Sequence, residues 1–176
     1  LAQTCSKEGA KIIPFLKAGY IAMRGIEFEQ WDDTLLGCQA ESFNSWMVQT
    51  LTSSPESDTD GKWETLAGVY AEREGSAALS LLSGAAEGSS NSRTFEAILS
   101  TMQDAVSPAF GAIPEGKADE LETSLKALAA KVDPERARSI ADRLMNIGRE
   151  SAAASLLATI YPERVQGGGG FMYAGV

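Results

Sequence analysis

The stretch LETSLKALAAKV, residues 121–132, carries the pattern that decides the fold class. Its three leucines and its valine recur every three or four residues, which places them on one face of an α-helix. Asp133 and Pro134 follow directly, and this pair is typical of a helix N-terminus, with Asp133 as the cap and Pro134 at the first helical position. The sequence therefore predicts two consecutive helices joined by a short connection.

The same spacing recurs along the rest of the chain, and no convincing alternation with a period of two appears. We expect seven or eight helices joined by short loops, which predicts an all-α domain built as an irregular helical bundle or a short stack of helical hairpins. The apolar positions that define the other expected helices are Ile13, Leu16, Tyr20 and Met23; Leu35, Cys38, Phe43, Trp46, Met47 and Leu51; Trp63, Leu66, Val69 and Tyr70; Phe95, Ile98, Leu99 and Met102; and Ile140, Leu144 and Ile147.

Two segments resemble each other. SAALSLL at residues 76–82 aligns with SAAASLL at residues 151–157, and each comes after a turn that contains glycine. One interpretation is that a helical hairpin was used twice. The alternative is two unrelated helices rich in alanine and leucine, the first of them capped by Ser76.

Composition limits the classes of function. The 176 residues suit one folded domain, which we place at 1–166, with a tether at 167–176. The formal net charge of -9 argues against nucleic acid as a partner, because no cluster of basic residues offsets it. No apolar stretch approaches the roughly 20 residues that span a bilayer, so we expect a chain that does not cross a membrane.

Histidine is absent, and the cysteines are Cys5 and Cys38. Catalytic systems in which a histidine activates a serine or a cysteine are therefore not expected, and neither are the usual zinc sites. The cysteines form either a disulfide or two separate thiols. The sequence begins with Leu1 rather than methionine, which inclines the expected localisation toward an exported or organelle-processed protein but leaves it open.

A polar loop holds a candidate calcium site. Glu56, Asp58 and Asp60, together with Gly61, resemble the first half of an EF-hand loop, in which oxygens at alternate positions converge on the ion. Position twelve should supply a bidentate carboxylate but is Ala67. We therefore expect calcium to bind weakly or not at all, and a solvated acidic loop explains the same residues.

A second acidic group surrounds Trp31. Paired carboxylates can act as acid and base, but carboxylates that precede a helix are explained equally by capping and by the helix dipole. Aromatic residues near this group and in the next helices could line a pocket for a ligand, although at helical spacing we expect them, including Trp46, in the core. The acidic residues are Glu27, Glu29, Asp32, Asp33 and Glu41, and the aromatic residues are Trp31, Phe43, Trp46, Trp63 and Tyr70.

The C-terminal segment is the candidate partner-binding element. Four glycines at 167–170 lack the lysine and the hydroxyl residue of a phosphate loop, and they precede Phe171, Met172 and Tyr173. We expect these three residues to dock into an apolar groove, preferably on a partner. The overall expectation is a non-catalytic helical subunit or adaptor in a larger assembly. The alternatives are a carboxylate-dependent enzyme using the group around Trp31 and a helical carrier of an apolar ligand or pigment, and the sequence identifies no cofactor.

Overall fold

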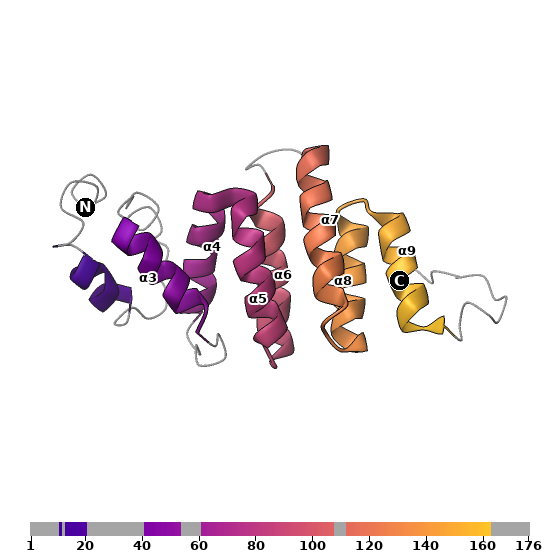
Figure 1. Cartoon of the computed structure of the whole chain (residues 1–176), viewed down its shortest axis with the longest axis horizontal. Coiled ribbons are helices and arrows are strands. Elements are labelled where there is room, and N and C mark those ends of the chain that lie inside the picture. Colours follow the sequence, from indigo (N-terminus) through magenta and orange to yellow (C-terminus); the bar gives the residue numbers. More distant parts are fainter. Residues whose placement is uncertain (1–10, 12, 21–40, 54–60, 108–111, 163–176) are drawn as a thin grey trace.

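The computed structural model describes residues 11, 13–20, 41–53, 61–107 and 112–162 of the chain. These residues form helices and no strand, which confirms the all-α prediction for the described part of the chain. Residues 13–20 are helical and precede the labelled helices of Figure 1. The labelled helices are α3 (Glu41–Leu51), α4 (Lys62–Glu74), α5 (Leu79–Gly88), α6 (Ser92–Asp104), α7 (Glu115–Ala129), α8 (Pro134–Asn146) and α9 (Glu150–Ile160), with the short 3-10 helix η2 (Gly75–Ala78) between α4 and α5.

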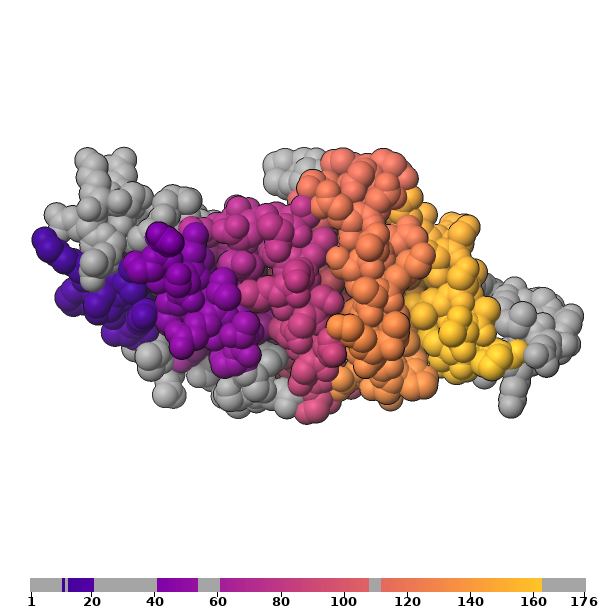
Figure 2. All heavy atoms as spheres, in the orientation of Figure 1, coloured from indigo at the N-terminus to yellow at the C-terminus, as the bar shows by residue number. Residues whose placement is uncertain are grey.

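The helices are stacked as hairpins in two layers. One layer is formed by α4, α6 and α8, each packed against the next, and the other by α5, α7 and α9. Helices that are consecutive in the chain also pack together, as α5 does with α6 and α8 with α9. Figure 1 shows this row running from α3 to α9, and the space-filling view of Figure 2 shows the same order from indigo to yellow along the longest axis. Of the two predicted arrangements, the contacts match the stack of hairpins.

Helix starts follow the expected capping chemistry in α8 but not in α5. The Asp133 carboxylate accepts hydrogen bonds from the amides of Glu135, at 3.0 Å, and Arg136, at 3.1 Å, as predicted. Ser76 does not cap α5, because residues 75–78 form the 3-10 helix and α5 begins only at Leu79. The Ser76 hydroxyl instead accepts a hydrogen bond from Lys117 Nζ on α7, at 2.7 Å. A long-range contact thus replaces the predicted local one.

The periodic apolar positions form the core. The leucines of α7 are completely buried, and so are Phe43, Leu66 and Ile98 on the preceding helices. Trp46 differs from the prediction because it is only partly buried and packs on the edge of the core against Tyr20, with ring centroids 5.4 Å apart. Its ring also lies against Phe43, with centroids 5.3 Å apart. None of the helices in the described ranges is long and apolar enough to cross a membrane.

Arginines join neighbouring hairpins within a layer. Arg136 on α8 lies over the ring of Phe95 on α6, 5.3 Å from its centroid. Two turns further along α8, Arg143 donates a hydrogen bond to Gln103 on α6 at 3.1 Å. The aliphatic stems of such side chains cover apolar surface while the guanidinium stays near water. These contacts fix the side of α8 that faces α6.

The two similar segments lie in the same layer but have different neighbours. The first lies in η2 and α5, and α5 packs against α6 and α7, whereas the second lies in α9, which packs against α8 and α7. Each comes after a glycine with positive φ, Gly75 at 57° and Gly148 at 77°, a backbone conformation that other residues rarely adopt. The aligned residues Ala78 and Ala153 are both completely buried. The two segments thus share a preceding glycine turn and a buried alanine, but their helices pack on different partners, so the interpretation that a hairpin was used twice stays a prediction.

Candidate functional site

Several of the predicted site residues lie outside the described residues, so their predictions stay untested. These are the partner-binding residues Phe171, Met172 and Tyr173 with the boundary at 166, the calcium-loop residues Glu56, Asp58 and Asp60, the cysteines, and the acidic residues around Trp31 except Glu41. Glu41 is exposed in the first turn of α3, where a carboxylate complements the helix dipole.

The described aromatic residues belong to the core or its edge. Trp63 is buried, and its indole Nε1 donates a hydrogen bond to the carbonyl oxygen of Leu51 at 3.3 Å. Phe43 is completely buried, while Tyr70 is half-buried. Burial, with a smaller contribution from Glu74, raises the pKa of the Tyr70 hydroxyl. Trp63 and Phe43 fit the expectation of a packed core, whereas the alternative of an aromatic-lined pocket, which includes Trp31 outside the described residues, stays a prediction.

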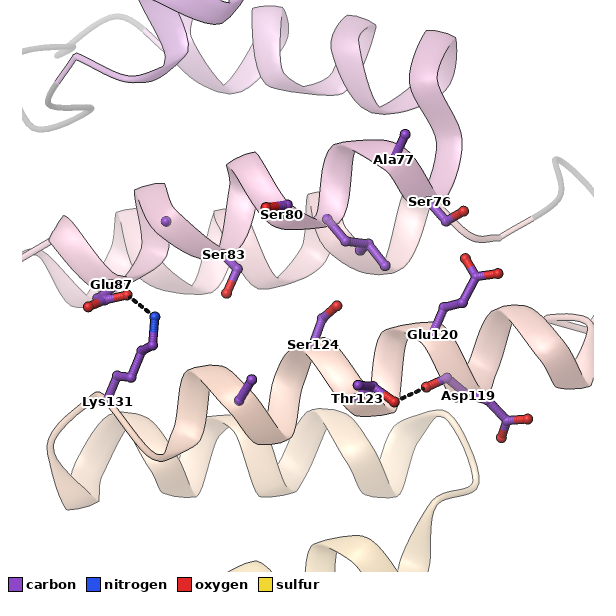
Figure 3. Close-up of a pocket in the computed structure, with 13 residues that line it drawn as sticks. Ser76, Ala77, Ser80, Ser83, Glu87, Asp119, Glu120, Thr123, Ser124 and Lys131 are labelled. Carbon is purple, nitrogen blue, oxygen red and sulfur yellow. Dashed lines mark hydrogen bonds and ion pairs between the residues drawn. The ribbon is translucent and has the colours of Figure 1, made fainter.

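A groove between α5 and α7 is the best candidate for a binding site in the described part of the chain. It has a volume of about 770 Å³ and is open to solvent. Figure 3 shows its two walls, formed by α5 with the preceding 3-10 helix on one side and by α7 on the other. The residues that line it are Ser76, Ala77, Leu79, Ser80, Ser83, Gly84, Glu87, Asp119, Glu120, Thr123, Ser124, Ala127 and Lys131.

Small side chains are the reason that this groove exists. Where two helices of a layer lie side by side, large residues would normally fill the space between them. Here α5 offers Ser80, Ser83 and Gly84, and α7 offers Ser124 and Ala127. In Figure 3, Ser83 points toward α7 and Ser124 toward α5. The two helices still pack against each other, so a shallow channel stays open above the core.

The floor and walls of the groove present hydroxyl groups. The Thr123 hydroxyl donates a hydrogen bond to the carbonyl oxygen of Asp119, 2.8 Å away in its own helix. Among the described residues, the hydroxyls of Ser80, Ser83 and Ser124 have no hydrogen-bond partner. Each hydroxyl can donate one hydrogen bond and accept others. The groove therefore carries hydrogen-bonding capacity that the described part of the fold does not use.

Ion pairs close both ends of the groove. At one end, Lys131 Nζ lies 2.8 Å from Glu87 Oε2 and links α7 to α5 (Figure 3). At the other end, Lys117 Nζ contacts both Ser76, at 2.7 Å, and Glu120, at 3.1 Å. Hydrogen bonding from Ser76 and then from Lys117 lowers the pKa of the Glu120 carboxyl. Glu120 is thus held in its charged form at neutral pH.

The carboxylates of the groove are engaged in ion pairs and hydrogen bonds. A general acid needs a raised pKa, whereas the pKa of Glu120 is lowered. The neighbouring carboxylate of Asp119 is paired with Arg149 at 2.8 Å. Within the described ranges, no group of three or more potential metal ligands comes together. The chemistry available in the groove is hydrogen bonding and charge pairing.

The sequence did contain a signal for this groove that the periodicity analysis missed. Ser76, Ser80 and Ser83 recur every three or four residues, so they share one side of α5 and the turn before it. Serine is a weaker helix former than alanine, because its hydroxyl competes for backbone hydrogen bonds. Helix propensity therefore does not explain a row of serines inside a helix. The structure explains the row, because these serines form the wall of α5 that faces α7 across the groove.

The fold and the groove together define a class: a stacked-hairpin helical domain with an open, hydroxyl-lined groove on one layer. Comparison with known proteins adds no narrower assignment, since no protein-family model, curated protein or solved structure matches the chain.

Proposed function

We propose that this chain is a non-catalytic helical adaptor that binds an extended segment of another protein in the groove between α5 and α7. The observation that carries the proposal is the open groove of about 770 Å³ with unused serine hydroxyls on both walls. An extended backbone presents N–H and C=O groups that need partners when they leave water. Serine hydroxyls can serve either group.

The spacing of the hydroxyls fits an extended chain. At 1.5 Å per residue, the helical path from Ser76 to Ser83 is roughly 10 Å long. About three residues of an extended segment, at roughly 3.3 Å each, span the same length. The small side chains at Gly84 and Ala127 leave room for the backbone of such a segment to approach the helices.

The charges of the groove indicate which segments it prefers. Three carboxylates, Glu87, Asp119 and Glu120, line it, and they are paired with Lys131, Arg149 and Lys117, respectively. The whole chain also carries a formal net charge of -9, which attracts basic segments at long range. We expect the bound segment to be neutral or basic and to avoid clusters of acidic residues.

The two alternatives from the sequence receive less support. An enzyme that uses carboxylates needs two of them with separated pKa values, and the three carboxylates in the groove are each held in an ion pair, by Lys131, Arg149 and Lys117. A carrier of an apolar ligand needs an enclosed apolar cavity. Both this groove and a smaller one of about 340 Å³ between α7 and α9 are open to solvent. Docking of Phe171, Met172 and Tyr173 on a partner is a second, separate proposal.

Selection from a random library of 12-residue peptides displayed on phage, with fluorescence anisotropy of the selected peptides, tests the proposed groove. We expect enrichment of lysine and arginine in the selected peptides. Ser83→Leu and Ser124→Leu fill the groove and should weaken binding at least tenfold. Ser45→Leu, on the exposed surface of α3, is the matched control and should leave binding unchanged. If no peptide is enriched, or if Ser83→Leu binds as tightly as the wild type, the groove is not the binding site.

A further inference from the structure

The three carboxylates of the groove between α5 and α7 differ in how firmly their own chain holds them. Arg149 binds one of them with a guanidinium that is only 18% exposed and that contacts two further carboxylates of α7. Glu120 is paired instead with Lys117, whose side chain is 44% exposed. Glu87 is paired with Lys131, whose side chain is 56% exposed. Ion pairs between exposed, flexible side chains contribute little to stability, so these two pairs can open at little cost.

One end of the groove holds an ammonium group between two oxygens. Lys117 Nζ lies 2.7 Å from the hydroxyl oxygen of Ser76 and 3.1 Å from a carboxylate oxygen of Glu120. Ser76 belongs to η2 and Glu120 to α7, so the fold brings the two oxygens together from opposite walls of the groove. Hydrogen bonding from Ser76, followed by that from Lys117, lowers the pKa of Glu120. This end therefore keeps a negative charge that binds an ammonium group.

The other end of the groove holds a second ammonium group. Lys131 Nζ lies 2.8 Å from Glu87 Oε2, and this pair crosses the groove (Figure 3). Glu87 is in the last turn of α5, where the negative end of the helix dipole also favours a cation. Each end of the groove thus presents a carboxylate that already binds a basic side chain.

The two carboxylates are about 16 Å apart along the groove. Ser76, beside Glu120, is eleven positions from Glu87 along η2 and α5, which is about 16 Å at roughly 1.5 Å per residue. Glu120 is also eleven positions from Lys131, which contacts Glu87. The two walls therefore give the same separation, because α5 and α7 run in the same direction on either side of the groove.

An extended chain covers this separation in five residues, at roughly 3.3 Å each. Successive side chains of an extended chain point to opposite sides, so two residues five positions apart also point to opposite sides. Glu87 is on the α5 wall and Glu120 is on the α7 wall, as Figure 3 shows. The length of the groove and the placement of its carboxylates therefore select the same spacing.

We propose that the groove recognises an extended segment with two basic residues five positions apart, one bound by Glu87 and the other by Glu120 together with Ser76. In the free chain, Lys117 and Lys131 occupy these two positions, and their ammonium groups move into water when a segment binds. The third carboxylate stays with its arginine and takes no part. This inference rests on the proposed function, since it names the class of segment that the groove binds.

The exchange of one basic side chain for another decides which segments bind more than how tightly they bind. A basic residue of the segment replaces an ion pair of the same kind, so the net gain is small. An acidic residue at the same place lies close to a carboxylate of equal charge and is rejected. Removing an internal lysine should therefore raise the affinity for basic segments, because their competitor is gone.

Three fluorescein-labelled peptides of 12 residues, built from alanine and serine, test the spacing. The first carries two arginines five positions apart, the second carries two arginines two positions apart, and the third carries two glutamates five positions apart. In fluorescence anisotropy with the full chain, the first peptide should bind at least fivefold more tightly than the second, and the third should bind most weakly. The first two peptides have the same charge, so equal affinities would overturn the proposal.

Lysine variants test the exchange. Lys117→Met and Lys131→Met each free one carboxylate and should bind the first peptide about threefold more tightly than the wild type does. Lys126→Met is the matched control, because it removes the same charge from α7, but its lysine pairs with Glu122, which does not line the groove. This control should bind like the wild type. Unchanged affinity in both Lys117→Met and Lys131→Met would show that these lysines do not compete with a segment, which overturns the proposal.

A double variant separates this proposal from that of the groove itself. Glu87→Gln combined with Glu120→Gln should bind the first two peptides equally, because the two charges that read the spacing are gone. A preference for the first peptide that survives in this variant overturns the proposal. If peptides bind and Ser83→Leu weakens them, but the spacing has no effect, the groove binds segments without these anchors and only the present proposal fails. If no peptide binds at all, both proposals fail.

Discussion

The guanidinium of Arg149 lies 2.7 Å from the carboxylate of Glu115, and this contact joins the start of α9 to the start of α7. The same guanidinium reaches Asp119 at 2.8 Å and Glu122 at 3.4 Å. The three carboxylates are spaced four and three residues apart, so they share one side of α7. The hydrogen bond to Glu115, followed by the negative charges of the three carboxylates, raises the pKa of Arg149. One arginine thus ties together two helices of the same layer.

Replacing Arg149 by methionine tests this tie. Methionine keeps much of the aliphatic stem, so the loss should come mainly from three unpaired carboxylates on one helix face. We expect the melting temperature to fall by several degrees, and the difference from wild type to shrink in 1 M salt, which screens the repulsion. Arg93→Met, at an exposed position of α6, should melt like the wild type in calorimetry. Equal melting of both variants would show that the Arg149 contacts contribute nothing.

The two neighbouring aromatics of α3 should differ in their contribution to stability. Phe43 is completely buried, and Phe43→Ala should lower the free energy of unfolding by about 3–5 kcal/mol. Trp46 is only partly buried, so Trp46→Ala should cost less, about 1–3 kcal/mol. Urea denaturation monitored by circular dichroism gives both values. The reverse order would contradict the position of Trp46 at the edge of the core.

Removing the cap of α8 should have a moderate effect. Asp133 accepts two backbone hydrogen bonds at the helix N-terminus, so Asp133→Ala should lower the free energy of unfolding by about 1 kcal/mol. Asp133→Asn keeps an acceptor oxygen and should lose less than half of that. Urea denaturation of the two variants in parallel measures the difference. Identical losses would mean that the charge, rather than the hydrogen bonds, stabilises the helix start.

The acid at one end of the groove should respond to its serine neighbour. Hydrogen bonding from Ser76 is the first cause that lowers the pKa of Glu120, so Ser76→Ala should raise that pKa toward its usual range. A lowered carboxyl pKa stabilises the fold above the pKa of the unfolded chain, and this contribution disappears as the pH falls through the folded value. NMR titration of the Glu120 carboxyl carbon measures the shift. Ser80→Ala, which leaves Ser76 in place, should not move it.

Deletion of residues 167–176 tests the tail separately. If Phe171, Met172 and Tyr173 dock on a partner through a glycine tether, the deletion should barely change the melting temperature of the isolated domain. Glycine loses the most backbone freedom on ordering, so a tether adds reach rather than stability. Calorimetry of the full chain and of the deletion variant shows whether the tail contributes to the stability of the domain. A decrease of many degrees would assign the tail to the core of the domain.

Local patterns in the sequence determined the helices and most of the core. The leucines of α7, the Asp133–Pro134 start of α8 and the apolar positions of α6 were all predictable, because helix periodicity and capping depend on residues within four positions of each other. These signals are local, and they survive in the fold unchanged.

Only the tertiary structure decided how those helices meet. Ser76 was expected to cap a helix, but its hydroxyl accepts a hydrogen bond from Lys117, 41 residues away. The serines that follow it on α5 form one wall of the groove. The aligned Leu82 and Leu157 have similar local sequence, yet one is completely buried and the other is not. Burial depends on which helices pack against a residue, and long-range packing of that kind leaves no trace in the spacing of neighbouring residues.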